Sequence, residues 1–597
     1  MTAPNRNTLW ARALADELAA SGVEAACVCP GSRSTPLTVA LAEHDDVEVF
    51  SHLDERSAAY FALGRGKRTG NPTPVVSTSG TATANFHPAV MEANQARVPL
   101  LVLTADRPPE LRHSGANQTV DQEKLYGDSV RHYEDLPEPE ADDRKLRSLR
   151  ASVCRALAET SGANPGPVHL NVPFRKPLEP VDVPGDIPDS FAAEYPLAAE
   201  GRDGPFVHAT PGRPMPDDAD VGALADAVAG AERGLVVAGP DDAFGLAASA
   251  ASDLTAATGF PLLADPLSSV RFGAHVDTAP VVGGYDGFLP DADGSSPVSL
   301  DEFDPGFVLR FGASPTSKVL RNFLRDSSAR QVVVDPAGGW REATFTAGDL
   351  VVADPTRLAR ELAERVQGGT AGAPAPAAWT ERWTNAEADY WDAVDGVERD
   401  ALLEGDVVAA AAADAPDPAT LFVSNSMPVR DLDRFARPRS ADLTVLGNRG
   451  ASGIDGVTSS ALGAGSATDD PLVLVTGDLA YYHDMNGLLA IARCEADATI
   501  VLVNNDGGGI FHMLPIENFD PPFTEQFETP HGLDLEATGD LYDLEFARFE
   551  TLAGFREAYS ESVGSPGTQV LEVQTDGEAS HRERERLDAH VRENAKN

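Results

Sequence analysis

Lysine is scarce in this chain, and positive charge is scarce with it. The 597 residues carry 47 Lys and Arg against 93 Asp and Glu, a formal net charge of −46, and only six of the basic residues are Lys. Because phosphate binding needs clustered cations, this balance argues against a general nucleic-acid binder and against docking on an anionic membrane. Excess carboxylate with little Lys predicts a protein adapted to concentrated salt, and an ordinary acidic enzyme is the alternative.

Cysteine is also rare. Four cysteines are too few for a disulfide scaffold, and no Cys-x-x-Cys pair offers a zinc site. Cys27 and Cys29 alternate within an apolar run, which favours buried thiols on one face of a strand. The cysteines therefore predict neither cross-links nor a structural metal.

Long apolar runs are absent as well. No window approaches the ~20 apolar residues that span a bilayer. The first residues show helical spacing of Leu9, Leu14 and Leu18 rather than the continuous apolar core of a signal peptide. These absences predict a soluble, cytoplasmic protein.

The residues that are present describe a globular chain with 42% apolar content. Short apolar runs alternate with helix-like segments, the pattern of parallel α/β sheets. Three blocks of similar size predict the α/β fold class with three doubly wound parallel-sheet domains. We place the domains at 1–185, 186–367 and 379–597, with a flexible Gly-, Ala- and Pro-rich linker at 368–378. The expected strands are Ala25–Cys29, Thr73–Ser77, Leu100–Thr104, Gly234–Ala238, Pro261–Ala264, Phe307–Phe311, Gln331–Asp335, Thr420–Ser424, Leu472–Thr476, Thr499–Asn504 and Gln569–Val573.

The most informative stretch joins two of these strands. One buried strand ends in Gly477-Asp478, and after a helix-like segment the next ends in Asn504-Asn505. Because a β-α-β unit sets its strands parallel, Asp478 and Asn505 are expected at the same carboxyl edge, where α/β proteins bind ligands. A carboxylate and an amide oxygen there suit Mg²⁺. A helix-capping Asp and a turn Asn are the ordinary alternative for either residue alone.

At these positions the sequence resembles the thiamine diphosphate enzymes, although Leu479 stands where their signature has a second Gly. The resemblance implies domains of the thiamine diphosphate-binding type. It also implies that Asp478, Asn505 and a carbonyl at Gly507 bind Mg²⁺, with Mn²⁺ as an alternative, and that the metal holds the diphosphate. Further cofactor contacts implied by the resemblance are Gly477, Leu479, Ile510 and Phe511.

Two more cofactor residues follow from the same resemblance. Glu55, after the expected second strand of the first domain, is the catalytic carboxylate that would hydrogen-bond the aminopyrimidine ring and help activate the cofactor. A lone Glu opening a helix is otherwise just favoured by the helix dipole. Ile454 is the bulky side chain that would hold the cofactor bent. In this family one cofactor lies between domains of different subunits, which implies a homodimer or homotetramer.

The N-terminal motifs narrow the resemblance. Cys29–Leu37, Ser77–Asn85, Thr104–Leu111, Gly115–Thr119 and Asn448–Gly456, taken in order, are similar to the menaquinone-pathway synthases, in which Gly-Asp-Leu is found. These enzymes decarboxylate 2-oxoglutarate and join the product to isochorismate by a Stetter-like 1,4-addition. Substrates with several carboxylates suit Arg, whose planar fork binds them in a bidentate manner. The implied substrate residues are Ser32, Arg33, Arg107, Asn117, Gln118, Lys318, Ser426, Arg430, Arg449, Phe511 and Leu514, with the cations expected to form an island inside an acidic surface.

Alternative functions stay open at this point. Another 2-oxoacid enzyme, such as a decarboxylase or acetolactate synthase, would need fewer cationic contacts, and a cofactor-free regulatory relative would not need Glu55, Asp478 and Asn505. The middle domain has no Gly-x-Gly-x-x-Gly, so no flavin or nucleotide is expected there. His483 and His512 lie close to the motifs but are not assigned to catalysis. The acidic, Arg-rich end from Glu578 to Asn597 is expected to be a surface helix.

Overall fold

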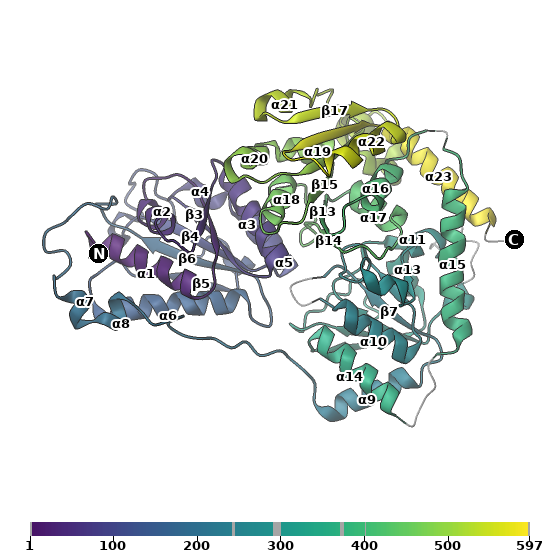
Figure 1. Ribbon diagram of the computed structural model, residues 1–597, viewed down its shortest axis with the longest axis horizontal. Coiled ribbons are helices and arrows are strands. Elements are labelled where there is room, and N and C mark those ends of the chain that lie inside the picture. The colour runs from purple at the N-terminus through teal and green to yellow at the C-terminus, as the bar shows by residue number, and fades with distance from the viewer. Residues whose placement is uncertain (1–2, 242–244, 290–299, 370–374, 400, 595–597) are drawn as a thin grey trace. The chain divides into compact units, whose positions relative to one another are not determined.

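In a computed structural model of the protein, the described residues form eighteen strands in three six-stranded sheets. Figure 1 shows how these sheets and their helices follow one another along the chain. The structure describes residues 3–241, 245–289, 300–369, 375–399 and 401–594. Every strand pairing in the described residues is parallel. The expected α/β class with three parallel sheets is therefore confirmed.

The first sheet has the order β2-β1-β3-β4-β6-β5. Its strands are β1 Ala25–Val28, β2 Glu48–Ser51, β3 Thr73–Ser77, β4 Leu100–Asp106, β5 His132–Asp135 and β6 Pro167–Pro173. Helices α1 Arg6–Ala20, α2 Thr35–Ala42 and α6 Asp143–Thr160 share one apolar core with this sheet. Helices α3 Glu55–Thr69 and α5 His87–Ala96 pack against each other, and α3 also packs on β3 and β1.

The third sheet repeats that topology with the order β14-β13-β15-β16-β18-β17. Its strands are β13 Ala419–Val423, β14 Leu443–Leu446, β15 Leu472–Gly477, β16 Thr499–Asn504, β17 Glu545–Phe549 and β18 Gln569–Gln574. Helices α16 Glu404–Ala413, α17 Met427–Phe435 and α22 Leu552–Ser562 share its core. Three further helices are α19 Asp478–His483, α21 Ala537–Tyr542 and α23 Gly577–Asn594. Helices α18 Val457–Gly465 and α20 Leu489–Cys494 come between these strands in sequence but belong to the unit of the first sheet, where α18 packs on α3.

The central sheet has a different order, β12-β11-β10-β7-β8-β9, which places its first and fourth strands side by side. Its strands are β7 Gly234–Ala238, β8 Leu262–Ala264, β9 Val281–Val282, β10 Phe307–Phe311, β11 Arg330–Val334 and β12 Asp349–Val351. The helices that pack with it include α9 Asp218–Ala229, α10 Ala248–Thr258, α11 Tyr285–Phe288, α13 Lys318–Asp326, α14 Pro355–Gly368 and α15 Ala377–Asp395. The three blocks are thus alike in layers and strand number but not in strand order.

All eleven strands expected from apolar runs are present, with ends shifted by two residues at most. The strands without such a run are mainly short or half-exposed edge strands, of which β17 is an example. The C-terminal helix is confirmed as α23, but it is not purely a surface helix, because Leu587 and Val591 are buried in the central core. Of the expected linker, residues 370–374 lie outside the described residues, and α15 contributes Trp379 and Trp383 to the central core.

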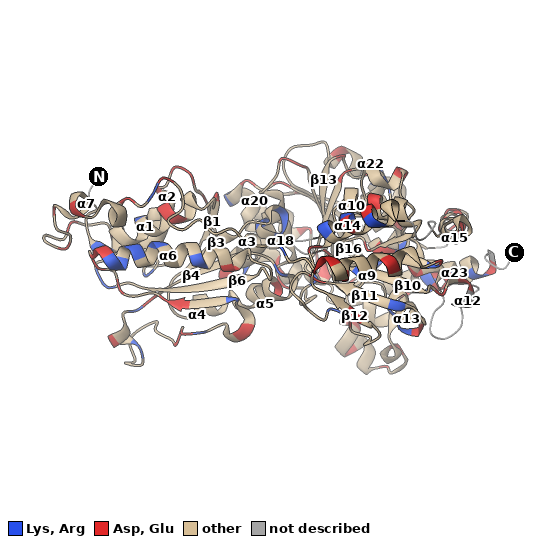
Figure 2. Cartoon of the chain, turned by 90° about the horizontal axis from the view of Figure 1, so that it is seen from below, with Lys and Arg blue, Asp and Glu red and all other residues tan. Residues whose placement is uncertain are grey.

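The chain divides into two compact units. The first contains Met1–Gly212, Asn448–Asp469 and His483–Asp497, and the second contains Arg213–Gly447, Asp470–Tyr482 and Ala498–Asn597. Charged residues lie mainly on helices and loops, whereas strands such as β3 and β16 have none (Figure 2). All four cysteines are free and buried, which confirms the expected burial of Cys27 and Cys29. Across the described residues, no helix is both long and apolar enough to cross a membrane.

Candidate active site

Asp478 and Asn505 lie where the two neighbouring strands β15 and β16 end, as the sequence predicts. The strands pair in parallel, with Gly477 opposite Val503. Asp478 is 2% exposed, and each of its oxygens accepts a backbone hydrogen bond: Oδ1 from Leu479 N at 2.7 Å and Oδ2 from Gly507 N at 2.9 Å. Burial raises the pKa of Asp478 above its ordinary value, and a nearby cation would favour its charged form.

The two adjacent asparagines differ in what their side-chain oxygens do. Asn504 uses both ends of its amide, because Nδ2 donates to Glu572 at 2.7 Å and Oδ1 accepts from Asp506 N at 3.0 Å. Asn505 Nδ2 donates to Glu404 Oε1 at 2.8 Å, but Asn505 Oδ1 is buried without a hydrogen-bond partner among the described residues. A buried, unsatisfied oxygen beside a carboxylate is suited to a hard cation.

His531 gives Asp478 a further partner. His531 Nδ1 lies 3.0 Å from Leu533 N and 3.2 Å from Asp506 Oδ1. His531 Nε2 lies 3.2 Å from Asp478 Oδ2, within hydrogen-bond distance. Hydrogen bonds of this kind hold a ligating carboxylate in one orientation.

Glycines let the backbone come close around these groups. A Cβ at Gly507 would lie 2.3 Å from the carbonyl oxygen of Glu528, and one at Gly509 would lie 2.4 Å from Asn505 Nδ2. In the described residues no group of three or more His, Cys, Asp or Glu side chains could hold a metal. One carboxylate, one amide oxygen and a backbone carbonyl still fit Mg²⁺ when phosphate oxygens and water complete the shell.

Glu55 is the first residue of α3, directly after β2 and the N-cap Asp54. It is half-buried, and among the described residues no hydrogen bond or ion pair reaches its carboxylate. Its neighbour Arg56 donates to the carbonyl oxygen of His483 at 2.7 Å, and Asn486 donates to Asp54 Oδ2 at 3.1 Å. These contacts fix the start of α3 and leave the Glu55 carboxylate available for a ligand.

The loop that contains Arg449 and Ile454 belongs to the same unit and is held by Glu92 of α5. Glu92 accepts from Gly450 N at 2.9 Å and from Ala451 N at 2.6 Å. The nearly buried Lys67 pairs with this carboxylate at 3.4 Å. Ile454 at the far end of the loop is 36% exposed, so its side chain can contact a ligand.

The predicted substrate residues of the first unit differ in exposure. Arg33 is buried, and its Nη1 donates to the carbonyl oxygen of Phe174 at 2.6 Å. Arg107 is half-buried and donates to the carbonyl oxygen of Asn117 at 2.8 Å. Gln118 Nε2 donates to Ser79 O at 3.0 Å, and Ser32 is exposed at the end of β1. Arg33 therefore has a structural contact in addition to any substrate role.

In the second unit, Ser426 and Arg430 lie at the start of α17. Ser426 has φ 68°, a strained conformation for a non-glycine residue, and its carbonyl oxygen accepts from Arg430 Nη1 at 2.5 Å. Lys318 is exposed at the first turn of α13 on the central sheet. Ile510 and Phe511 are half-buried just after the metal loop, and Leu514 is 44% exposed.

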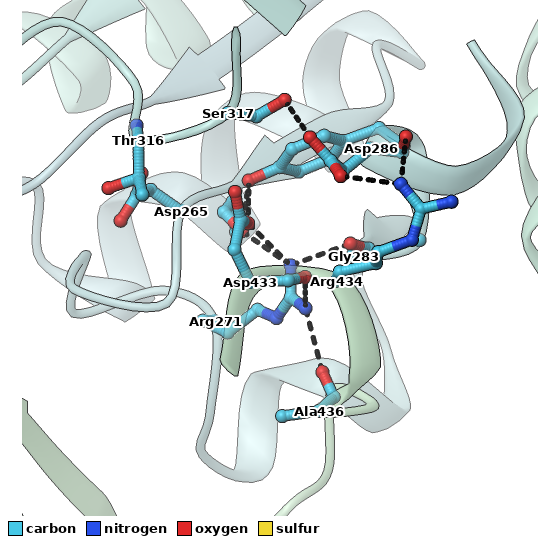
Figure 3. Close-up of polar contacts among 12 residues, drawn as sticks. Asp265, Arg271, Gly283, Asp286, Thr316, Ser317, Asp433, Arg434 and Ala436 are labelled. Atoms are coloured by element: carbon cyan, nitrogen blue, oxygen red, sulfur yellow. Dashed lines mark hydrogen bonds and ion pairs between the residues drawn. The ribbon is translucent and has the colours of Figure 1, made fainter. Parts of the chain in front are cut away.

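The far end of α17 is fixed by Arg271, a fully buried residue of the central domain (Figure 3). Its Nη2 donates to the carbonyl oxygens of Asp433 at 2.9 Å and Ala436 at 2.7 Å. Its Nη1 donates to those of Ala264 and Gly283. Tyr285 donates to Asp433 Oδ1 at 2.7 Å, and burial raises the pKa of Asp433 well above its usual range. The helix that carries Ser426 and Arg430 is thus anchored to the central domain.

Comparisons with known proteins agree with this geometry. Residues 10–125 match the N-terminal TPP binding domain of thiamine pyrophosphate enzymes, and residues 430–573 match the C-terminal TPP binding domain. The chain is 68% identical to a 2-succinyl-5-enolpyruvyl-6-hydroxy-3-cyclohexene-1-carboxylate synthase from Halobacterium salinarum, over 98% of both chains. The chain belongs to this synthase family.

Other relatives extend the comparison. The synthase of Haloarcula marismortui is 62% identical over 99% of both chains, and that of Roseiflexus castenholzii is 45% identical over 96% of both. A thiamine diphosphate-dependent 4-hydroxybenzoylformate decarboxylase of Rhodococcus jostii shares the fold, with TM-score 0.70 and 19% identity over 95% of this chain and 99% of that one. The chain is thus an enzyme of the thiamine diphosphate class, and halophilic relatives agree with the salt adaptation expected from its charge.

Sequence reasoning missed Glu404, His531, Glu92 and Arg271. Glu404 lies 101 residues before the asparagine it binds, and the others are single polar residues in ordinary contexts. Glu92 had one available signal, a Glu on the buried side of a helix of the first domain. The others become visible only when the tertiary structure places them.

Proposed function

We propose that this protein is a Mg²⁺-dependent thiamine diphosphate enzyme that forms 2-succinyl-5-enolpyruvyl-6-hydroxy-3-cyclohexene-1-carboxylate and CO₂ from 2-oxoglutarate and isochorismate. The observation that carries the proposal is the buried, unsatisfied Oδ1 of Asn505 beside Asp478, in a chain 68% identical to a synthase of that name. By its charge and relatives the enzyme acts in the cytoplasm of a salt-loving cell, as one step of menaquinone biosynthesis.

The chain's own residues divide the work. Asp478, Asn505 Oδ1 and the Gly507 carbonyl would hold Mg²⁺, or Mn²⁺ in its place, which would neutralise the charge of the diphosphate. Glu55 would hydrogen-bond a nitrogen of the aminopyrimidine ring, and Ile454 would support the cofactor from the side. When bound, thiamine diphosphate supplies the electron sink for decarboxylation.

Binding of two anionic substrates falls to polar and cationic side chains. Guanidinium groups pair with carboxylates in a bidentate manner and keep their charge at any working pH. The residues proposed for this role are Ser32, Arg33, Arg107, Asn117, Gln118, Lys318, Ser426, Arg430 and Arg449. Phe511 and Leu514 form an apolar wall that limits water near the reacting carbon atoms.

We also propose a homodimer or homotetramer, because the family resemblance pairs Glu55 of one subunit with Asp478 of another.

The test is an omission experiment in concentrated salt. The protein is incubated with thiamine diphosphate, Mg²⁺, 2-oxoglutarate and isochorismate, and isochorismate absorbance and product mass are followed. The proposal expects isochorismate to disappear only when all components are present. Release of CO₂ from 2-oxoglutarate with no loss of isochorismate would instead identify a different 2-oxoacid enzyme.

A further inference from the structure

Glu404 is a buried carboxylate at the start of α16 that belongs to none of the motifs and touches a proposed metal ligand. It is 4% exposed, and its Oε1 accepts from Asn505 Nδ2 at 2.8 Å and from Thr575 Oγ1 at 3.2 Å. Its backbone N–H donates to Ser580 Oγ at 3.1 Å, which fixes the first turn of the helix. A buried carboxylate is costly and needs such partners.

The side chain of Asn505 has two ends of nearly equal shape and opposite chemistry. A half-turn of the amide exchanges an acceptor oxygen for a donor nitrogen, and hydrogen-bond partners decide which end points where. Nδ2 is the end that faces Glu404, because Glu404 Oε1 accepts from this nitrogen and from Thr575 Oγ1. Oδ1 is then turned away from Glu404, and this is the atom left buried without a partner among the described residues.

We propose that Glu404 is a positioning residue that holds the Asn505 amide with its oxygen, not its nitrogen, toward the metal. The inference rests on the metal site of the proposed function. It assigns Glu404 no contact with substrate or cofactor. Side chains that orient ligands in this way tune metal affinity from outside the coordination shell.

The neighbouring Asn504 also donates to a buried glutamate, but its side-chain oxygen has a hydrogen-bond partner. Asn504 Nδ2 donates to the buried Glu572, but Asn504 Oδ1 is already used by Asp506 N. The chain therefore pairs both asparagines with a buried Glu, and only the pair with Glu404 leaves an oxygen free. The backbone of Gly509 packs closely against that amide, because a Cβ at Gly509 would lie 2.4 Å from Asn505 Nδ2.

Binding, not turnover, is the first measurement. Calorimetric titration of thiamine diphosphate at several Mg²⁺ concentrations gives the half-saturating Mg²⁺ for the wild-type protein, Glu404→Ala and Glu404→Gln. Glu404→Ala should raise it about 10- to 100-fold, the usual cost of losing a ligand-orienting partner. Glu404→Gln should stay within about threefold, because its side-chain carbonyl can still accept from Asn505 Nδ2. Wild-type affinity in Glu404→Ala, or equal losses in both variants, would overturn the proposal.

A double-mutant cycle separates positioning from general damage. If Glu404 acts through Asn505, then Glu404→Ala should cost less than about twofold in an Asn505→Ala background. Additive losses would contradict the proposal. Thr575→Val is the matched control, because it removes the other hydrogen bond to the same Glu404 oxygen and should change the half-saturating Mg²⁺ less than about twofold. A loss equal to that of Glu404→Ala would mean that any change in this pocket has the same effect.

A second background covers the case in which Glu404→Ala does not fold. In Asn505→Asp both ends of the side chain are oxygens, so orientation no longer matters and Glu404 becomes a repelling neighbour. Adding Glu404→Gln should then tighten Mg²⁺ binding; unchanged or weaker binding would overturn the proposal. These experiments test the positioning role of Glu404 separately from the proposed reaction. If the wild-type protein binds thiamine diphosphate with Mg²⁺ but forms no product, only the proposed reaction is refuted.

If the protein forms the product but the effects of Glu404 and Asn505 substitutions on Mg²⁺ binding are additive, only the positioning role of Glu404 is refuted.

Discussion

The first and third sheets share one strand order and carry different chemistry at the same edge. In the first sheet, β2 is followed by Glu55 at the start of α3, a carboxylate with no protein partner in the described chain. In the third, β15 and β16 are followed by Asp478 and Asn505, a carboxylate and an amide bound from several sides. Topology brings residues to the carboxyl edge, and their local partners differ: the Glu55 carboxylate is left available, whereas Asp478 and Asn505 are held in place.

The central sheet completes the comparison. Its strand order differs from the other two, and it is linked to the proposed site by Arg271, which holds the end of α17, and by the proposed substrate residue Lys318. We expect this domain to contribute stability and position rather than cofactor chemistry. Variants in the three sheets should therefore fail in three distinguishable ways.

The largest effect is expected in the first sheet. Glu55→Gln should lower kcat by about 10³- to 10⁴-fold, near the upper range for loss of a proton-handling group. Thiamine diphosphate and Mg²⁺ should still bind, because the metal ligands are untouched. Steady-state rates and calorimetry on the same sample provide the check, and near-normal turnover would remove Glu55 from its assigned role.

The third sheet should fail by losing the cofactor. Asp478→Ala removes a buried charged ligand, for which about 1,000-fold weaker Mg²⁺ binding is expected. The half-saturating Mg²⁺ for cofactor binding measures this loss. An unchanged half-saturating Mg²⁺ concentration would show that Asp478 is not a metal ligand and would contradict the proposed difference between the two sheets.

The central sheet should fail by losing stability. Arg271→Met removes the guanidinium donor that four buried carbonyl oxygens share, although that of Ala264 still accepts from Tyr285, and it leaves Asp433 without this nearby cation. A loss of about 3–5 kcal/mol in the free energy of unfolding is therefore expected. Denaturant titration in concentrated salt measures it. Arg325→Met, which removes an exposed pair with Asp326, is the control and should cost less than about 1 kcal/mol.

A smaller effect is expected from pH. Burial raises the pKa of Asp484 to about 6, so its protonated form is favoured in the folded state. Its contribution to stability is complete below pH 4 and is lost as pH rises through 6. Asp484→Asn keeps an oxygen that can accept from Ser459 N, and its side chain does not titrate. Between pH 4 and pH 7 the free energy of unfolding of this variant should therefore rise by about 2–3 kcal/mol relative to that of the wild type.

Glu342 of the central domain should show the opposite dependence of stability on pH, because its pKa is lowered rather than raised. Hydrogen bonds from Thr344, Thr346 and Ala347 outweigh the effect of its burial and lower its pKa to about 2. Its stabilising effect should be complete above pH 4.5 and should disappear as pH falls toward 2. Unfolding curves of Glu342→Gln against the wild type test this, and a difference independent of pH would contradict it.

The sequence predicts what repeated apolar pattern and family motifs encode. Continuous apolar runs such as Leu472–Thr476, rich in β-branched residues, predict buried strands, whereas the edge strand β17 has half-exposed, charged residues and no such run. Asp478 and Asn505 were accessible because they follow strands at a recognisable spacing. Glu404 and His531 were not, because a hydrogen bond between residues far apart in sequence exists only after folding.

The central claim is that Glu55 and Asp478 serve one cofactor, and the resemblance assigns them to different subunits. Mixing Glu55→Gln with Asp478→Ala subunits tests this directly, because a mixed dimer would have one doubly altered site and one intact site. We expect each variant alone to be inactive and the reassociated mixture to recover about a quarter of wild-type activity, since half of the dimers are mixed and each has one working site. Activity in the mixture no higher than in either variant alone would contradict the account.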